Sequence, residues 1–170
     1  MASEVTPRRA LAGIATALFL LIAPGTVAGF IPWWITRWRF PGPQWFVAEI
    51  AGGLLILGAV CVLVESFARF AWKGLGTPAP VFPTRHLVVS GLYRFVRNPM
   101  YVAVVSAIIG QALLFANLPL AGYGALVWVS FHAFVILYEE STLRKTFGTE
   151  YQLFVANVPR WIPRLTPWTG

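Results

Sequence analysis

Two short polar clusters in an otherwise apolar chain carry the residue types that could do chemistry. The first is the stretch Arg85–Tyr101, with the sequence RHLVVSGLYRFVRNPMY, and the second is the pair Glu139-Glu140. Together they offer carboxylates, an amide, two tyrosines and several cations. This mixture suits a ligand that carries both a positive centre and polar hydroxyls. We therefore expect the two clusters to form one binding site.

Other common kinds of site do not fit these residues. The acidic residues are all glutamates, only two of them are adjacent, and the two histidines are isolated, which is a poor donor set for a divalent metal. The chain has no glycine-rich phosphate loop and no convincing serine–histidine–acid order. The single cysteine, Cys61, excludes an internal disulfide. We interpret Cys61 as a packing residue, because free cysteine is frequently buried.

The composition of the chain is typical of an integral membrane protein. Of its 170 residues, 58% are hydrophobic and 11% are charged, whereas a soluble domain usually carries about 25% charged residues. The formal net charge of +7 fits cytoplasmic loops that face anionic lipid. We therefore expect membrane lipids, and not nucleic acid, as partners of these basic residues.

Long apolar runs separated by turn signals predict an all-α polytopic membrane protein with four transmembrane helices, or five if the apolar segments break differently. The four predicted spans are Leu11–Ile31, Trp45–Val64 with an extension towards Phe70, Met100–Asn117 and Ala121–Tyr138. We treat residues 1–170 as a single membrane domain. Residues 1–70 form the two N-terminal spans, and residues 71–170 form the ligand-binding core.

The segments between and after the spans have their own patterns. The aromatic stretch Pro32–Gln44 and the uncharged triplet Leu118-Pro119-Leu120 predict turns. Ser141–Asn157 predicts a cytoplasmic amphipathic helix with a weak point at Phe147-Gly148, and the proline-rich tail after it is expected to lie along the membrane interface. Glu49 reads either as a helix-start carboxylate or as a functional intramembrane carboxylate.

Capping signals place the polar stretch next to the third span. Ser90 is expected to cap a short helix over Gly91–Arg97, and Asn98 to cap the span that follows, with Pro99 at its first position. Basic residues then set the orientation, because eleven fall on one side of the four predicted spans and two on the other. This count predicts cytoplasmic N- and C-termini, in the inner membrane if the source is a bacterium.

The third and fourth spans are expected to form an antiparallel hairpin. The hairpin returns the chain to the side on which it started, so the end of the fourth span comes back near the start of the third. Glu139-Glu140 should therefore face the segment Arg97–Tyr101. This juxtaposition is the sequence-based reason for treating the two clusters as one site.

The paired motifs resemble the isoprenylcysteine carboxyl methyltransferase and phospholipid methyltransferase superfamily. The resemblance covers about Gly76–Arg164 and rests on HLVVSGLYRFVRNPMY, an apolar hairpin, and then EESTLRKTFGTEYQLFVANVPRWIPR. Members are integral membrane enzymes that use S-adenosylmethionine. The resemblance implies methyl transfer to a lipophilic or membrane-associated acceptor, such as a phospholipid amine, a prenylcysteine-like carboxylate or a small hydrophobic thiol.

The resemblance also implies which residues hold the cofactor. Carried over by position, they are Arg85, His86, Leu87, Val88, Tyr93, Asn98, Pro99, Met100, Tyr101 and Glu139. Backbone groups of Arg85–Val88 are expected to approach S-adenosylmethionine, and Glu139 to bind its polar part. Tyr151 and Arg160 are further candidates.

This chain departs from the carboxyl methyltransferases at two positions. Asn98 stands where they have histidine, and an amide cannot shuttle a proton. Val135 stands where they have an arginine one helical turn before the glutamate, which pairs with the substrate carboxylate. The missing cation disfavours a prenylcysteine carboxylate as the acceptor.

Methyl transfer needs alignment of the two reactants more than it needs reactive side chains. An amine acceptor would also require a proton acceptor, and Glu140 or His132 could serve. With Asn98, they complete our set of candidate catalytic residues. His132 lies seven residues before Glu139, a spacing that puts both on about the same face of an α-helix.

Each of these residues also has a structural interpretation. Glu140 and Arg144 are spaced as an i, i+4 helix ion pair, and Arg94 and Arg97 could anchor lipid headgroups. His132 could be a hydrogen-bonded packing residue. For the whole chain, the alternative to an enzyme is a non-catalytic membrane transporter or assembly subunit that retains the fold.

Overall fold

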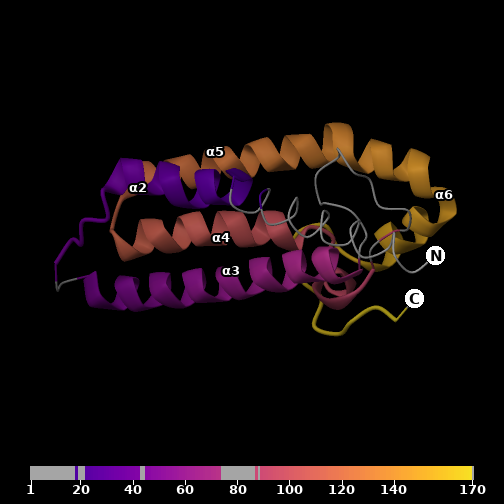
Figure 1. Cartoon of the computed structure of the whole chain (residues 1–170), viewed down its shortest axis with the longest axis horizontal. Coiled ribbons are helices and arrows are strands. Elements are labelled where there is room, and N and C mark those ends of the chain that lie inside the picture. Colours follow the sequence, from indigo (N-terminus) through magenta and orange to yellow (C-terminus); the bar gives the residue numbers. More distant parts are fainter. Residues whose placement is uncertain (1–17, 19–21, 43–44, 74–86, 88, 170) are drawn as a thin grey trace, which may run out of the picture.

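The computed structural model describes residues 18, 22–42, 45–73, 87 and 89–169. Within these residues the chain is helical and has no strand. The elements are η1 (Thr26–Phe30), α2 (Ile31–Thr36), α3 (Phe46–Lys73), η3 (Gly91–Arg94), α4 (Pro99–Leu114), α5 (Leu118–Phe134), η4 (Val135–Glu139) and α6 (Glu140–Asn157). Figure 1 shows α3, α4 and α5 running side by side along the long axis, with α2 against one end.

Two of the described helices are long and apolar enough to cross a membrane. They cover Phe46–Arg69 and Leu118–Asn157, and Pro99–Leu114 is a shorter apolar helix. The second continues from α5 through η4 into α6 with no break at residues 139–140, where the sequence predicted a boundary between the fourth span and a separate amphipathic helix. Residues 11–17 and 19–21 of the first predicted span lie outside the described residues.

The outward faces of α3 and α5 are apolar. Leu54 and Leu57 on α3 and Leu126 and Val129 on α5 each expose more than half of their surface. This pattern is the one expected of helices whose outer face contacts lipid. Cys61 is also exposed on α3, so the prediction that it is buried by packing is wrong.

Helices α3 and α4 approach each other closely because both carry glycine at the crossing. A Cβ atom at Gly52 would lie 2.7 Å from the backbone nitrogen of Leu114, and one at Gly110 would lie 2.8 Å from the Ile56 side chain. Small residues at helix crossings allow this backbone approach in membrane proteins. Ala59, Ala103 and Ala107 continue the buried seam.

The first helix extends further than predicted. It passes through a π-helical segment, η1, and continues as α2 to Thr36, although the sequence predicted an end at Ile31 and a turn from Pro32. Proline is tolerated here because it stands in the first turn of α2, where its missing N–H is not needed. Arg37 then ends the helix in a left-handed conformation, with φ of 50°.

The π-helical segment η1 is held by polar side chains from two other helices. Gln111 of α4 donates to the carbonyl oxygen of Ala28 at 2.6 Å, and Tyr123 of α5 donates to that of Val27 at 3.0 Å. A π-turn shifts backbone hydrogen bonds from their α-helical partners, so its carbonyl groups can accept from elsewhere. The first helix is therefore fastened to the α4–α5 hairpin.

The turn between α4 and α5 falls three residues earlier than predicted. Helix α4 ends at Leu114, Ala116 adopts a positive φ of 44°, and α5 already begins at Leu118. The side chain of Asn117 accepts from the Leu120 backbone nitrogen at 2.9 Å and so caps α5, with Pro119 in the first turn. The triplet predicted as a turn is thus the start of the helix.

Helix α6 bends sharply at Gly148, where φ is 51° and ψ is −120°, which confirms the predicted weak point. Beyond the bend, Tyr151 and Phe154 are buried together with Val158 against the loop that contains Leu87 and Val89. Figure 1 shows α6 turning back at the end of the bundle where α3 ends. The bend therefore allows residues 151–158 to pack against this loop.

Candidate functional site

The α4–α5 hairpin brings the two polar clusters together. The Tyr101 phenol, in the first turn of α4, donates a hydrogen bond of 2.8 Å to Oε2 of Glu139, the last residue of η4. The predicted proximity of Glu139 to the segment Arg97–Tyr101 is confirmed. The Tyr101 ring also packs against that of Phe131, with centroids 4.7 Å apart.

The segment before α4 is shorter in helix and differently bonded than predicted. Gly91–Arg94 forms one 3-10 turn where we expected a helix to Arg97. Neither Ser90 nor Asn98 makes a side-chain capping bond. Asn98 is buried, and its Nδ2 donates to the backbone oxygen of Arg160 at 3.2 Å. The amide therefore holds the C-terminal tail, which we define as residues 158–169.

Glu140 forms ion pairs with two arginines from different parts of the chain. Its Oε1 accepts from Arg97 at 3.0 Å and from Arg160 Nε at 2.6 Å, and its Oε2 accepts from Arg160 at 3.0 Å. The Glu140 and Arg97 side chains are 14% and 11% exposed. The predicted pairing with Arg144 is not the one formed. Hydrogen bonding to Glu140 raises the pKa of Arg160, so its charge is retained.

The C-terminal tail runs alongside the polar segment and bonds to its backbone. The backbone nitrogen of Arg97 donates to Pro159, that of Arg164 donates to Phe95, and that of Trp168 donates to Arg94, at 2.9 to 3.0 Å. These contacts join residues more than 60 positions apart in the sequence. The tail is therefore part of the site.

His132 belongs to an aromatic group on another face. Its Nδ1 accepts from the Trp161 indole at 3.1 Å, and its ring lies 6.1 Å from that of Trp128. The segment η4, which follows His132 and ends at Glu139, is π-helical, so the α-helical spacing that placed both residues on one face does not apply. Tyr101, which donates to Glu139, contacts the ring of Phe131.

Tyr93 lies in the electrostatic field of two glutamates, Glu139 of η4 and Glu65 of α3. Burial raises the pKa of the Tyr93 phenol, and the negative charges of Glu139 and Glu65 raise it further, so the phenol stays protonated. Glu65 forms an i, i+4 ion pair with Arg69 in the last turns of α3. Sequence reasoning did not include Glu65 in the site, although it interrupts an apolar run and is one of only six glutamates.

Several buried polar atoms around these residues have no hydrogen-bond partner among the described residues. They are Oε2 of Glu65, Oγ of Ser66, Oγ of Ser90 and Nε of Arg97. Buried polar groups are nearly always paired in folded proteins. One carboxylate acceptor, one guanidinium donor and two hydroxyls, which can do either, are thus left for a polar ligand to pair with.

The other predicted cofactor residues have varied positions. Leu87 packs on the buried group of Tyr151, Phe154 and Val158, and Met100 packs on the core between α3, α4 and α5. Pro99 is buried at the start of α4. Arg85, His86 and Val88 lie outside the described residues.

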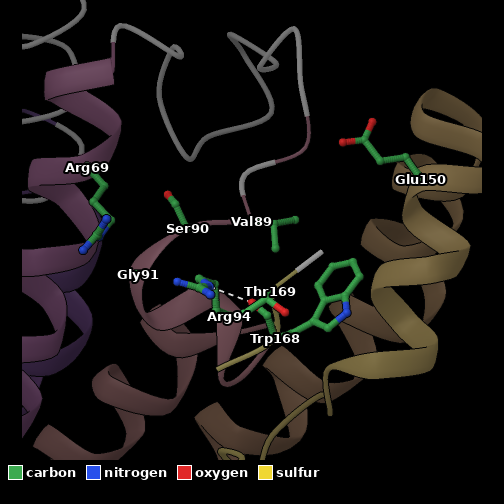
Figure 2. A pocket seen from close by; sticks show the side chains of 8 residues that line it. All are labelled: Arg69, Val89, Ser90, Gly91, Arg94, Glu150, Trp168 and Thr169. Atoms are coloured by element: carbon green, nitrogen blue, oxygen red, sulfur yellow. Dashed lines mark hydrogen bonds between the residues drawn. The ribbon is translucent and has the colours of Figure 1, made fainter. Parts of the chain in front are cut away.

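A pocket of about 640 Å³ opens at the same end of the molecule. Figure 2 shows Arg69, Arg94 and Trp168 around it, with Glu150 of α6 on the opposite wall. Val89, Ser90, Gly91 and Thr169 complete the lining. None of the seven predicted cofactor residues that the structure describes lines this pocket. Sequence reasoning missed the pocket because its walls come from four separate segments.

An all-helical bundle with membrane-length helices and a polar site at one end defines the structural class. Within this class the chain belongs to the phospholipid methyltransferase family, whose sequence pattern matches residues 47–150, more than half of the chain. The matched region includes Tyr93, Asn98, Tyr101 and the Glu139-Glu140 pair.

Two curated proteins are similar to this chain. Protein-S-isoprenylcysteine O-methyltransferase B of Arabidopsis thaliana is 26% identical over 129 residues, which are 73% of this chain and 64% of that protein. Nickel-cobalt-cadmium resistance protein NccN of Alcaligenes xylosoxydans xylosoxydans is 28% identical over 123 residues, which are 72% of this chain and 56% of that protein. The chain thus spans about three fifths of the length of these relatives.

Proposed function

We propose that this chain is an integral membrane methyltransferase that transfers the methyl group of S-adenosylmethionine to a lipophilic acceptor. The observation that carries the proposal is the hydrogen bond from Tyr101 to Glu139, formed within the region that matches the family. It supports the proposal because it orients a carboxylate that could bind the polar part of the methyl donor. The resemblance described above supports the same residues.

The residues present fit the methyl donor chemically. S-adenosylmethionine carries an ammonium group, a carboxylate, a sulfonium and ribose hydroxyls. Glu139 and Glu65 can accept from ammonium or hydroxyl groups, whereas Ser66 and Arg97 can donate to oxygen atoms. Buried atoms of Glu65, Ser66 and Arg97 have no partner among the described residues, which supports this match. When bound, the donor supplies an electrophilic methyl group.

Residues of this chain would align the reactants and exclude water. Tyr101 would orient the Glu139 carboxylate, and Tyr93 would remain a neutral hydrogen-bonding group because its pKa is raised by burial. The ion pairs of Glu140 would hold the tail against the start of α4. We propose that Glu140 contributes through this positioning, since both of its oxygens already accept hydrogen bonds.

The acceptor would reach the site from the membrane. Val135 is 1% exposed, so the position at which the carboxyl methyltransferases have a substrate-binding arginine is occupied here by a buried aliphatic side chain. This supports a phospholipid amine or a small hydrophobic thiol over a prenylcysteine-like carboxylate. We further propose that the polar end of the bundle, with Arg69, Arg94 and Arg97, faces the cytoplasm together with both termini.

The test is transfer of a labelled methyl group from S-adenosylmethionine into a total membrane extract, followed by identification of the labelled product. Calorimetry on the detergent-purified protein measures donor binding separately. We expect Glu139→Gln to weaken donor binding by at least tenfold and Glu49→Gln, at the opposite end of α3, to leave it unchanged. Absence of binding to the parent protein, with Glu139→Gln indistinguishable from it, would falsify the proposal and favour a non-catalytic membrane protein.

A further inference from the structure

Exposed aromatic side chains gather at the end of the bundle that lies away from the Tyr101–Glu139 pair. Figure 1 shows the end of α2 and the start of α3 at this end, opposite α6. We define the aromatic surface as residues 30–42 and 45–47, which lie at the junction of these two helices. Large exposed apolar patches mark interaction sites. Six aromatic residues of this surface are between 47% and 66% exposed, namely Phe30, Trp34, Trp38, Phe40, Trp45 and Phe46.

The aromatic surface also carries two cations. Arg37 and Arg39 are exposed, and no acidic residue occurs between positions 26 and 48. Glu49 follows in the first turn of α3, where the partial positive charge of a helix N-terminus favours a carboxylate. No ion pair between Glu49 and either arginine is found in the described part of the chain. Both cations can therefore attract an anionic partner.

The Arg37 side chain is positioned by a ring and not by a carboxylate. Its guanidinium carbon lies 4.8 Å from the centroid of the Trp33 ring. A cation–π contact does not neutralise the charge, and it provides no acceptor atom for the N–H groups. These groups can then donate to a ligand, and their planar fork matches the oxygen atoms of a phosphate in geometry and charge.

The turn that presents Arg37 and Trp38 has an unusual backbone. Both residues have a positive φ, of 50° and 51°. This left-handed conformation is unfavourable for a residue with a Cβ atom, and strain of this kind is commonly found at functional positions. Thr36 holds the turn, because its Oγ1 donates to the Pro32 carbonyl oxygen at 2.9 Å and accepts from the Trp38 backbone nitrogen at 3.1 Å. The turn thus keeps an exposed arginine and an exposed tryptophan where glycine would be favoured.

The aromatic surface is fixed relative to the long helices. The Phe40 ring contacts the buried ring of Phe115, just after α4, edge-on with centroids 5.3 Å apart. From this surface, the apolar segment Phe46–Arg69 of α3 extends over 24 residues, which is about 36 Å. The hydrocarbon core of a bilayer is about 30 Å thick. With Phe46 at one interface, Arg69 therefore reaches the headgroup layer on the other side.

We propose that the aromatic surface binds the headgroup layer of the leaflet opposite the polar end of the bundle. Arg37 and Arg39 contact the phosphate groups of anionic phospholipids, and the exposed rings lie at the boundary with the acyl chains, the depth that tryptophan prefers. This binding does not depend on the chain being an enzyme. In combination with the proposed function, on which this one consequence rests, it would put the methyl-transfer site at the headgroup depth of the other leaflet, where the amine of a phospholipid lies.

Tryptophan fluorescence of the full chain in phosphatidylcholine–phosphatidylglycerol vesicles tests the depth. The emission of the parent minus that of Trp34→Phe/Trp38→Phe/Trp45→Phe isolates the aromatic surface. We expect a spin label on the lipid headgroup to quench this difference emission about threefold more strongly than a label near the end of the acyl chain. Trp128→Phe is the matched control. Trp128 lies about 15 Å along α5 from Leu118, so the label on the acyl chain should quench its emission more strongly.

A comparison of spin-labelled phosphatidylglycerol with spin-labelled phosphatidylcholine tests the two arginines. We expect the anionic lipid to quench the difference emission about twofold more strongly in the parent, and this preference to be lost in Arg37→Gln/Arg39→Gln. The matched control is Arg144→Gln/Lys145→Gln, which removes the same charge from exposed positions of α6 and should keep the preference. Arg39→Gln alone should reduce the preference, which gives an answer even if the double variant is unfolded.

Four outcomes would overturn the proposal. Stronger quenching by the label on the acyl chain would show that the rings lie in the hydrocarbon core. Quenching by aqueous iodide, but by neither lipid label, would show a surface in water that is open to another macromolecule. An unchanged preference in Arg37→Gln/Arg39→Gln would contradict the role of the arginines, and loss of the preference with equimolar inorganic phosphate would show a site for free anions. None of these readouts measures methyl transfer, so such a failure is distinguishable from a failure of the proposed function.

Discussion

Nδ1 of His132 accepts a hydrogen bond of 3.1 Å from the indole of Trp161. An accepting Nδ1 leaves the proton of the neutral ring on Nε2. The nitrogen that could take up a proton is thus already used to hold the tail. This relationship favours the structural interpretation of His132 over the catalytic one.

We expect His132→Phe to reduce stability and to leave methyl transfer nearly intact. Phenylalanine keeps the ring stacked near Trp128 but leaves the Trp161 indole without its acceptor, at a cost of about 1 kcal/mol. Thermal unfolding in detergent measures the first effect, and kcat for labelled methyl transfer should change less than threefold. A hundredfold loss of kcat at unchanged unfolding temperature would return His132 to the catalytic set.

The ion pairs of Glu140 make it a larger contributor to stability. Glu140→Gln would leave Arg97 and Arg160 without their shared carboxylate, and breaking a largely buried pair costs roughly 3–5 kcal/mol. Arg160→Met should cost less, because Arg97 continues to neutralise Glu140. A double-mutant cycle of the two changes should show a coupling energy clearly different from zero, and additive effects would mean that the pair contributes nothing.

The close crossing of α3 and α4 predicts opposite responses at two glycines of one helix. Gly52→Ala places a Cβ atom 2.7 Å from the Leu114 backbone nitrogen and should cost about 1–3 kcal/mol through overpacking. Gly58→Ala meets no atom within 4 Å and should be neutral or slightly stabilising. Comparable melting temperatures for the two variants would show that the helices are further apart.

The anchoring of the first helix can be tested through Gln111. Gln111→Leu removes the hydrogen bond to the Ala28 carbonyl oxygen, and we expect a loss of about 1 kcal/mol, in the range measured for interhelical bonds in membranes. Ser130→Ala is the matched control, because Ser130 is exposed and bonds only within its own helix, to Leu126. Limited proteolysis at residues 37–42 should report release of the first helix in the Gln111 variant alone.

The sequence was sufficient to predict the helical class and the meeting of Tyr101 with Glu139. Both follow from apolar run lengths and a short turn, which force antiparallel packing. The π-helical segments η1 and η4 were not predictable, because one extra residue per turn hardly changes an apolar run. For the same reason His132 was placed on the wrong face relative to Glu139.

The pocket and the tail contacts could not be predicted from the sequence for a different reason. The bond between Arg94 and Trp168 joins positions 74 residues apart, and no periodicity links a proline-rich tail to a 3-10 turn. Asn98 shows the same limit. Its position before Pro99 was read as a cap, but the buried amide bonds across the fold to Arg160.

The pairing of residues 159–168 with residues 94–98 also determines the order in which contacts can form during synthesis. Helices α3, α4 and α5 can insert into the membrane and pack as soon as they leave the ribosome, because their contacts are among themselves. Asn98 and Glu140 acquire their partner Arg160 only after the later residues are synthesised. A nascent chain arrested before residue 159 would therefore have its helices packed but would lack the tail contacts around the proposed site.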